Sequence, residues 1–390
     1  MQPFDLHSLL APFAIVFFAT WIIALKMTQT LTSSLLAALI KSGLFLIYFG
    51  VFFDGTFTFS DDWSYLQGGK DLIAYKVGIT SLADNWGIVL RIGGGEHIVY
   101  YLYNAFAIHL FGEGYYAPVA LNILLTLLVA GLGTSLAVQE FGVSDIQKKI
   151  LFFFLLLHPD ILAWSNIMNG KDQLVLLLHV VLLISFSLYF RSRIMSAVAL
   201  AIPAIALLLF LRFYVPFLFA TTLVVSAIIG GRTKKRAHYI CGGAILGIFA
   251  FFWIGSAGVQ DIITSLKDNF VNPFYGFIRY VLTPIPFNTD ENYSFLNLPA
   301  LIHWLLISFA CWGVFAIYRI GTPFSRFFLC YLACFVGLYS VFGALQGPRH
   351  RVQLDYAWAI LQFSGLADYI RMKRGANATS MLAPVMRDDT

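Results

Sequence analysis

Long apolar stretches separated by short polar ones dominate this sequence. A helix that spans a bilayer needs about 20 apolar residues, because each residue rises about 1.5 Å against about 30 Å of hydrocarbon. By this rule the sequence predicts eleven spanning helices and an all-α, polytopic transmembrane bundle. The predicted spans cover residues 9–25, 35–53, 117–139, 150–165, 173–190, 194–211, 213–229, 238–257, 299–318, 327–346 and 352–370. The shorter, aromatic stretch 98–111 predicts an interfacial or re-entrant helix.

Composition agrees with this pattern. Of the 390 residues, 59% are hydrophobic and 12% charged, whereas a soluble domain has roughly 25% charged residues. A soluble enzyme, a disordered scaffold and a coiled coil are therefore excluded. We interpret residues 1–374 as a single transmembrane domain and 375–390 as a polar C-terminal tail. The cysteines lie in apolar stretches without metal-binding spacing and are predicted to be packing residues: Cys241, Cys311, Cys330 and Cys334.

Lysine and arginine predict the orientation of the bundle. Connections on the cytoplasmic side of a membrane protein carry more of these residues, and here 15 fall on one side against 9 on the other. We expect a multi-pass protein of a bacterial-type inner or plasma membrane. The less basic outer side holds two long loops, 54–116 and 258–298, and long loops usually carry function. The net charge of +5 is thus a topology signal, and no nucleic-acid partner is needed to explain it.

Two adjacent carboxylates, Asp61 and Asp62, open the first outer loop, with Tyr65 one turn later. One interpretation is a juxtamembrane helix with Ser60 or Asp61 at its N-cap, which Trp63 and Tyr65 anchor in the interface. The other is that one carboxylate accepts a proton from a hydroxyl nucleophile while its neighbour orients it or holds a metal. With Glu96 or Asp172, the pair is a candidate ligand set for Mg²⁺ or Mn²⁺.

Further polar residues gather at the outer ends of predicted spans. His158, Asn169, Lys171 and Asp172 lie between two spans that are nearly free of charge, and polar residues at such a depth indicate function. The alternative is a local ion pair of Lys171 and Asp172 that buries neither charge. Arg212 sits on a tight connection between two spans, where a snorkelling interface role is the alternative.

A last basic segment precedes the final span. Arg349 and Arg351 flank His350 at a helix entry, where unsatisfied backbone N–H groups favour phosphate. Attraction to lipid headgroups is the alternative explanation. A carboxylate pair with several cations on one face suits transfer of a group from a phosphate leaving group to a hydroxyl.

In their order and common sidedness, these features resemble the GT-C superfamily of integral-membrane glycosyltransferases, which use polyprenyl-phosphate sugars. The resemblance covers about residues 54–370. The matching features are Asp61-Asp62 with Tyr65, Glu96-His97 leading to Leu110-Phe111-Gly112, Asn122, Pro159 to Asp172, and Arg349-His350-Arg351. The chain departs from the family in an additional span before the acidic loop and in lacking a large soluble C-terminal domain.

The resemblance implies roles for these residues. Asp61 or Asp62 would be the catalytic base, and the candidate phosphate-binding residues are Lys171, Arg212, Arg349, His350 and Arg351. Candidate substrate-binding residues are Tyr65, Glu96, His97, His158, Asn169 and Asp172. The implied partners are a polyprenyl-phosphate-linked sugar donor, a glycan or lipid acceptor and membrane lipids.

The implied activity is an inverting hexosyl- or pentosyltransferase of cell-envelope glycan or glycolipid synthesis, working outside the cytoplasm. An oligosaccharide repeat-unit polymerase is a related alternative, since it shares multiple spans and outer arginines. A transporter or lipid flippase is a weaker one, because such proteins often show paired internal repeats and charges near the midplane, and this sequence shows no convincing repeat. Here Lys41 is the clearest charge within a span.

Overall fold

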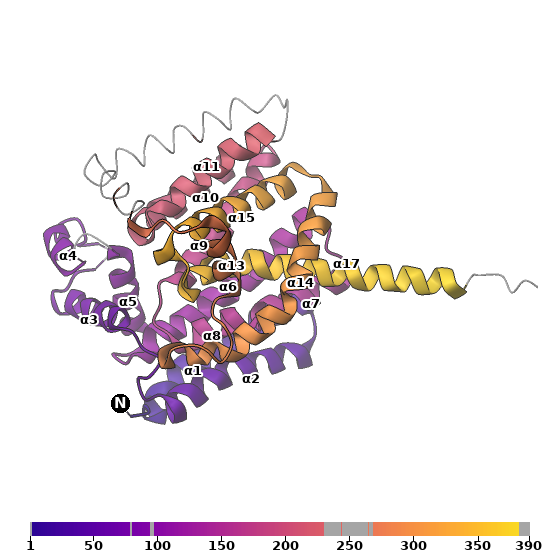
Figure 1. Cartoon of the computed structure of the whole chain (residues 1–390). Helices are drawn as coiled ribbons and strands as arrows, with labels where there is room; N and C mark the ends of the chain where they lie inside the picture. Colours follow the sequence, from indigo (N-terminus) through magenta and orange to yellow (C-terminus); the bar gives the residue numbers. More distant parts are fainter. Residues whose placement is uncertain are drawn as a thin grey trace, which may run out of the picture.

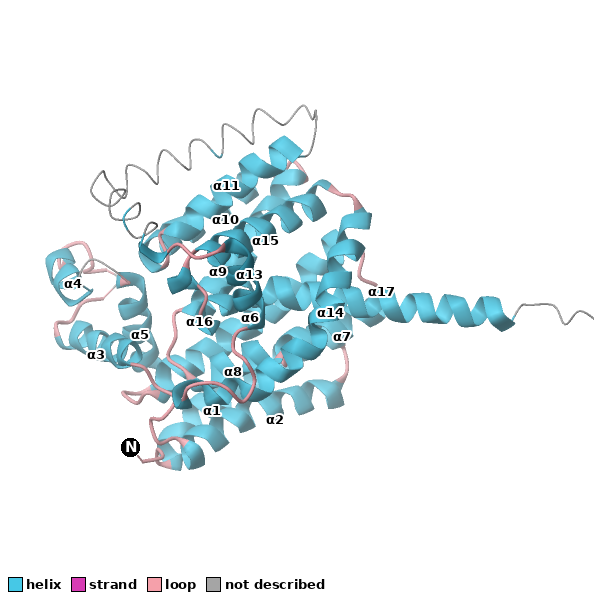
Figure 2. Ribbon diagram, in the orientation of Figure 1, coloured by secondary structure: helices cyan, strands magenta, loops and turns pink. Residues whose placement is uncertain are grey.

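The computed structural model describes residues 2–78, 80–93, 97–229 and 268–381, together with Gly243 and Thr264. In these residues helices are joined by loops and turns, and no strand occurs (Figure 2). The prediction of an all-α fold is therefore confirmed. The helices pack into a bundle whose core holds the buried faces of α6 (Tyr116–Phe141), α9 (Asp172–Phe190), α15 (Pro323–Val341) and α17 (Asp355–Met381).

Seven helices in the described residues are long and apolar enough to cross a membrane, which makes this a multi-pass membrane protein. An eighth span results if the bent pair α7 (Asp145–Leu156) and α8 (Pro159–Ile167) counts as one. The seven are α1 (Leu6–Thr28), α2 (Leu31–Ile47) with η1 (Tyr48–Phe52), α6 (Tyr116–Phe141), α9 (Asp172–Phe190), α10 (Ile194–Leu211), η2 (Glu291–Leu296) with α14 (Asn297–Ile320), and α15 (Pro323–Val341).

The structure does not confirm eleven spans, for identifiable reasons. Helix α11 (Tyr214–Ile229) has 16 residues and is short for a crossing. Helix α17 (Asp355–Met381) forms where a span was predicted, but Asp355, Asp368 and Arg371 lower its hydropathy. The predicted span 238–257 lies outside the described residues apart from Gly243, as do residues 258–263 and 265–267 of the predicted loop 258–298.

Glycines explain how the charged helix α17 fits against α14. A Cβ atom on Gly313 of α14 would lie 1.9 Å from the Leu361 carbonyl oxygen of α17. A Cβ on Gly365 of α17 would lie 1.9 Å from the Phe309 carbonyl oxygen of α14. The two backbones therefore touch at a crossing that only glycine permits, as small residues allow in membrane helix pairs.

Shorter helices gather at one end of the bundle. Helices α3 (Ser60–Ala74), α4 (Trp86–Gly93) and α5 (Ile98–Phe111) form a subassembly at that end, on the left of Figure 1, whereas α17 projects from the opposite end. Helix α5, predicted as interfacial or re-entrant, packs between α3 and α6. The remaining short elements are α13 (Pro273–Leu282), η3 (Gly343–Leu345), α16 (Pro348–Arg351) and η4 (Val352–Leu354).

The cysteines that the structure describes make no disulfide. Cys311, Cys330 and Cys334 are free thiols, and Cys241 lies outside the described residues. Cys330 and Cys334 are half-buried, whereas Cys311 is exposed on α14.

Candidate active site

Asp172 organises a charged cluster at the end of the bundle that carries α3 and α5. As the first residue of α9 it is 1% exposed. Its two carboxylate oxygens accept hydrogen bonds from Arg212 Nη2 at 2.9 Å, Arg349 Nε at 2.9 Å and Gln353 Nε2 at 2.8 Å. Two segments far apart in sequence, one with Arg212 and one with Arg349 and Gln353, thus converge on one carboxylate, which balances part of the buried positive charge.

Arg349 links this buried centre to an exposed carboxylate. Its Nη1 atom lies 3.3 Å from Asp61 Oδ2. The Asp61 side chain is 57% exposed, whereas that of Arg349 is 16% exposed. Asp61 is therefore the carboxylate of this cluster that faces solvent, and it stands directly beside a guanidinium.

The two guanidiniums retain unused hydrogen-bond donors. Arg349 Nη2 and Arg212 Nε are buried, and neither has a hydrogen-bond partner among the described residues. Arg212 Nη1 lies 3.5 Å from His350 Nε2. Burial and the charge of Arg212 lower the pKa of His350 to about 3, so its imidazole is neutral at pH 7. Because a buried donor without a partner costs free energy, this cluster favours an anionic acceptor.

Lys171 and His97 are hydrogen-bonded to each other at the edge of the same cluster. Lys171 Nζ lies 2.6 Å from His97 Nε2 and 5.7 Å from the centroid of the Tyr65 ring. Burial and the charge of Arg212 lower the pKa of the Lys171 ammonium to about 7. Burial and the charge of Lys171 lower the pKa of His97 to about 4. A neutral His97 therefore accepts the hydrogen bond, and Lys171 can exchange its proton near neutral pH.

Asp62 has a different environment from Asp61. It is fully buried, and its Oδ2 atom accepts hydrogen bonds from Phe59 N at 3.1 Å and Tyr115 Oη at 3.0 Å. Burial raises the pKa of this carboxyl to about 7. Asp62 thus caps α3 from the third residue of the helix and fixes its first turn against Tyr115, directly before α6. The N-cap residue is Phe59, so the prediction of Ser60 or Asp61 at this position is wrong.

Asn169 links the loop between α8 and α9 to α3. Its Nδ2 atom donates to the Asp62 carbonyl oxygen and to Asn104 Oδ1, both at 2.9 Å. Its Oδ1 atom accepts from Tyr100 Oη at 2.9 Å. With no exposed surface, Asn169 positions Asp61 and Lys171 relative to each other.

Arg351 and His158 belong to a separate network inside the bundle. Arg351 is 2% exposed, lies 2.9 Å from Asp160 Oδ1 and donates to the Thr283 carbonyl oxygen. His158 is equally buried and lies 3.0 Å from Gln362 Oε1. Arg349 and Arg351 therefore have different partners despite their proximity in sequence. Of these two arginines, only Arg349 belongs to the charged cluster that reaches solvent.

Metal ligands do not converge in the described residues. There, no three His, Cys, Asp or Glu side chains are close enough to hold a metal ion together. Asp61 and Asp62 differ in exposure and in partners, so they do not present their oxygens as a pair. Glu96, a candidate ligand and substrate-binding residue, lies outside the described residues.

Sequence reasoning missed several polar residues of the cluster. Gln353 follows Arg349 by four residues, and this helical spacing is the one signal that could have indicated it. Tyr115 and Asn104 lie on apolar, aromatic segments that looked like ordinary packing. Their partners are distant in sequence, which explains why pattern alone could not reveal them.

Comparisons with known proteins add no family assignment to this geometry. No family model, curated protein or solved structure matches the chain.

Proposed function

We propose that this protein is a membrane glycosyltransferase that transfers a sugar from a polyprenyl-phosphate-linked donor to an acceptor hydroxyl. The observation that carries the proposal is the contact between the exposed Asp61 and Arg349, whose guanidinium also contacts the buried Asp172. This contact sets a carboxylate that can accept a proton beside cations that can hold a phosphate.

The proposed reaction needs one base and one stabilised leaving group. The acceptor oxygen attacks the anomeric carbon of the donor, and its proton passes to the Asp61 carboxylate. The bond between the anomeric carbon and the phosphate oxygen breaks, with inversion at that carbon. Polyprenyl phosphate leaves with the bonding electron pair, and Arg349 and Arg212 stabilise its negative charge.

Lys171 has a separate role in this proposal. Its ammonium lies at the edge of the same cluster, and its pKa of about 7 suits proton exchange near neutral pH. It adds a charge to the phosphate site when protonated. The excess of Lys and Arg that the sequence predicts on the cytoplasmic side supports a reaction at the opposite, outer end of the bundle, in the membrane of a cell that builds envelope glycans.

Replacing Asp61 with Asn tests the proposed base. Transfer by membranes that contain Asp61→Asn should fall by about 10²–10⁴-fold, since general-base catalysis contributes that much. Asp84→Asn is the matched control, because Asp84 is an exposed acid of the same loop outside the cluster. Products are measured by mass analysis of glycolipids and polysaccharides.

Full transfer by Asp61→Asn would remove this residue from catalysis. The product distribution also separates the related activity. One added sugar per acceptor supports a transferase, whereas a ladder of repeat units supports a polymerase.

A further inference from the structure

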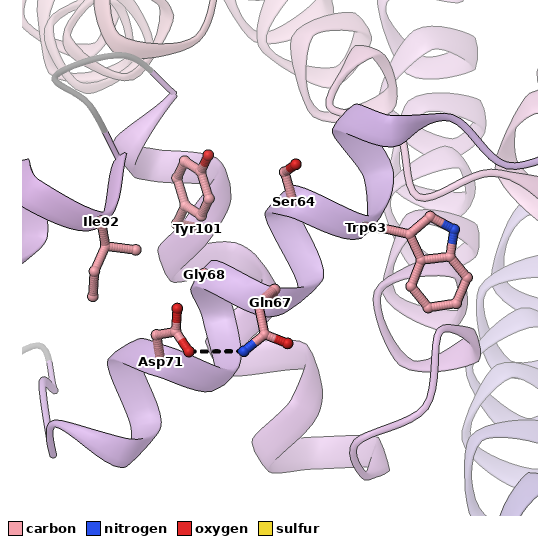
Figure 3. A pocket seen from close by; sticks show the side chains of 7 residues that line it. All are labelled: Trp63, Ser64, Gln67, Gly68, Asp71, Ile92 and Tyr101. Carbon is pink, nitrogen blue, oxygen red and sulfur yellow. Dashed lines mark hydrogen bonds between the residues drawn. The ribbon is translucent and has the colours of Figure 1, made fainter.

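A groove runs along the exposed side of α3, outside the charged cluster. Its volume is about 560 Å³, within the range of about 300–1,000 Å³ typical of small-molecule sites. Figure 3 shows its lining, which consists of Trp63, Ser64, Gln67 and Asp71 of α3 with Ile92 of α4 and Tyr101 of α5. The groove therefore combines aromatic rings with hydroxyl, amide and carboxylate groups.

Gly68 shapes this groove by allowing Tyr101 to lie over α3. A Cβ atom at Gly68 would lie 2.1 Å from Tyr101 Cδ1, so any other residue would displace the ring. Beside Gly68, Gln67 Nε2 donates to Asp71 Oδ1, one turn further along α3, at 2.8 Å. The amide oxygen of Gln67 and the second carboxylate oxygen of Asp71 are additional hydrogen-bond acceptors at the groove.

The groove adjoins the proposed catalytic base. Asp61, Ser64, Gly68 and Asp71 are spaced by three, four and three residues, so they fall on one stripe of α3. Ser64 follows Asp61 by about 4.5 Å along the helix axis. On the other side, Tyr101 packs against Tyr65 at 5.6 Å between ring centroids, and Lys171 lies over Tyr65.

We infer that this groove binds a saccharide and is the acceptor subsite of the enzyme. The apolar face of a sugar ring packs on an aromatic ring, while its hydroxyls donate to acceptors such as Gln67 and Asp71 and accept from Ser64. A sugar held there has its next hydroxyl at Asp61. The acceptor role depends on the proposed transferase activity, but saccharide binding does not.

Saturation-transfer NMR on the full chain in lipid nanodiscs tests this inference. The probes are disaccharides of glucose, galactose, mannose, N-acetylglucosamine and rhamnose, without any glycosidic detergent. At least one should receive saturation on its ring protons. Trp63→Ala and Gln67→Ala should each weaken that binding about tenfold. Gln67 is exposed, so its replacement reports on the groove even if Trp63→Ala destabilises the fold.

Trp86→Ala is the matched control, because Trp86 is 38% exposed on α4 and does not line the groove. It should bind as the wild type does. The inference is overturned if none of the disaccharides binds, if inositol binds equally well, or if both groove variants bind normally.

Asp61→Asn should keep saccharide binding while losing transfer. Binding without any transfer by the wild type would refute the proposed activity and leave the groove as a saccharide site.

Discussion

Adjacent carboxylates on α3 meet different surroundings because helix neighbours project about 100° apart. Asp61 reaches solvent and Arg349, whereas Asp62 is enclosed by Phe59 and Tyr115. The sequence predicted both a cap and a reactive carboxylate at this pair. The structure gives the capping role to Asp62, which faces the bundle, and the reactive role is our proposal for the exposed Asp61.

The buried carboxyl of Asp62 should make stability depend on pH. Burial raises its pKa from 3.8 to about 7, so the folded state binds a proton more tightly than the unfolded state. Stability should therefore fall as pH rises from about 4 to about 7, by at most about 1.4 kcal/mol per pH unit. Thermal unfolding of Asp62→Asn should lose this decline. An unchanged pH profile would show that Asp62 is not its source.

Asp172 should matter for folding as well as for activity. Asp172→Asn removes the counter-charge of the largely buried Arg212 and leaves Arg349 only the exposed Asp61. This change should destabilise the protein by about 3–5 kcal/mol. Asp61→Asn should leave the midpoint of thermal unfolding unchanged, since the Asp61 side chain is 57% exposed. The two midpoints, measured in the same detergent, check this difference. Equal midpoints would contradict the central position given to Asp172.

At the scale of helices, close contact between α3 and α5 positions the cluster. A Cβ atom on Gly69 would lie 2.8 Å from the Ala105 backbone nitrogen, so Gly69→Ala must move one helix. We expect about 1–3 kcal/mol of destabilisation and reduced transfer. Gly43→Ala is the control, because no atom lies within 4 Å of a Cβ there. Thermal unfolding should show no loss for Gly43→Ala, and equal losses would contradict this packing.

The elements were predictable wherever one local property determined them. Length and hydropathy indicated α1, α6, α9, α10, α14 and α15. The break between α7 and α8 falls at Pro159, inside the predicted span 150–165. Which span ends meet was not predictable, because the cluster joins residues such as Asp172 and Gln353 across 181 positions. The separation of Arg349 from Arg351 likewise depends on how α16 is held against α9 and α13.

Across the whole molecule, the charged cluster and the tip of α17 lie at opposite ends (Figure 1). We therefore expect single cysteines at Asp84 and Lys373, in a background without the native cysteines, to label from opposite sides. A membrane-impermeant maleimide should modify Asp84→Cys in intact cells and Lys373→Cys only after permeabilisation. Labelling of both positions in intact cells, or in the reverse order, would contradict the proposed orientation.

The central claim is that Arg212 and Arg349 bind the phosphate of a lipid carrier. Native mass spectrometry of the purified chain with undecaprenyl phosphate and with undecaprenol measures this directly. The wild type should retain the phosphate lipid and not the alcohol, and Arg349→Gln should lose most of that preference. Equal retention of both lipids by the wild type, or an undiminished preference in Arg349→Gln, would contradict the account.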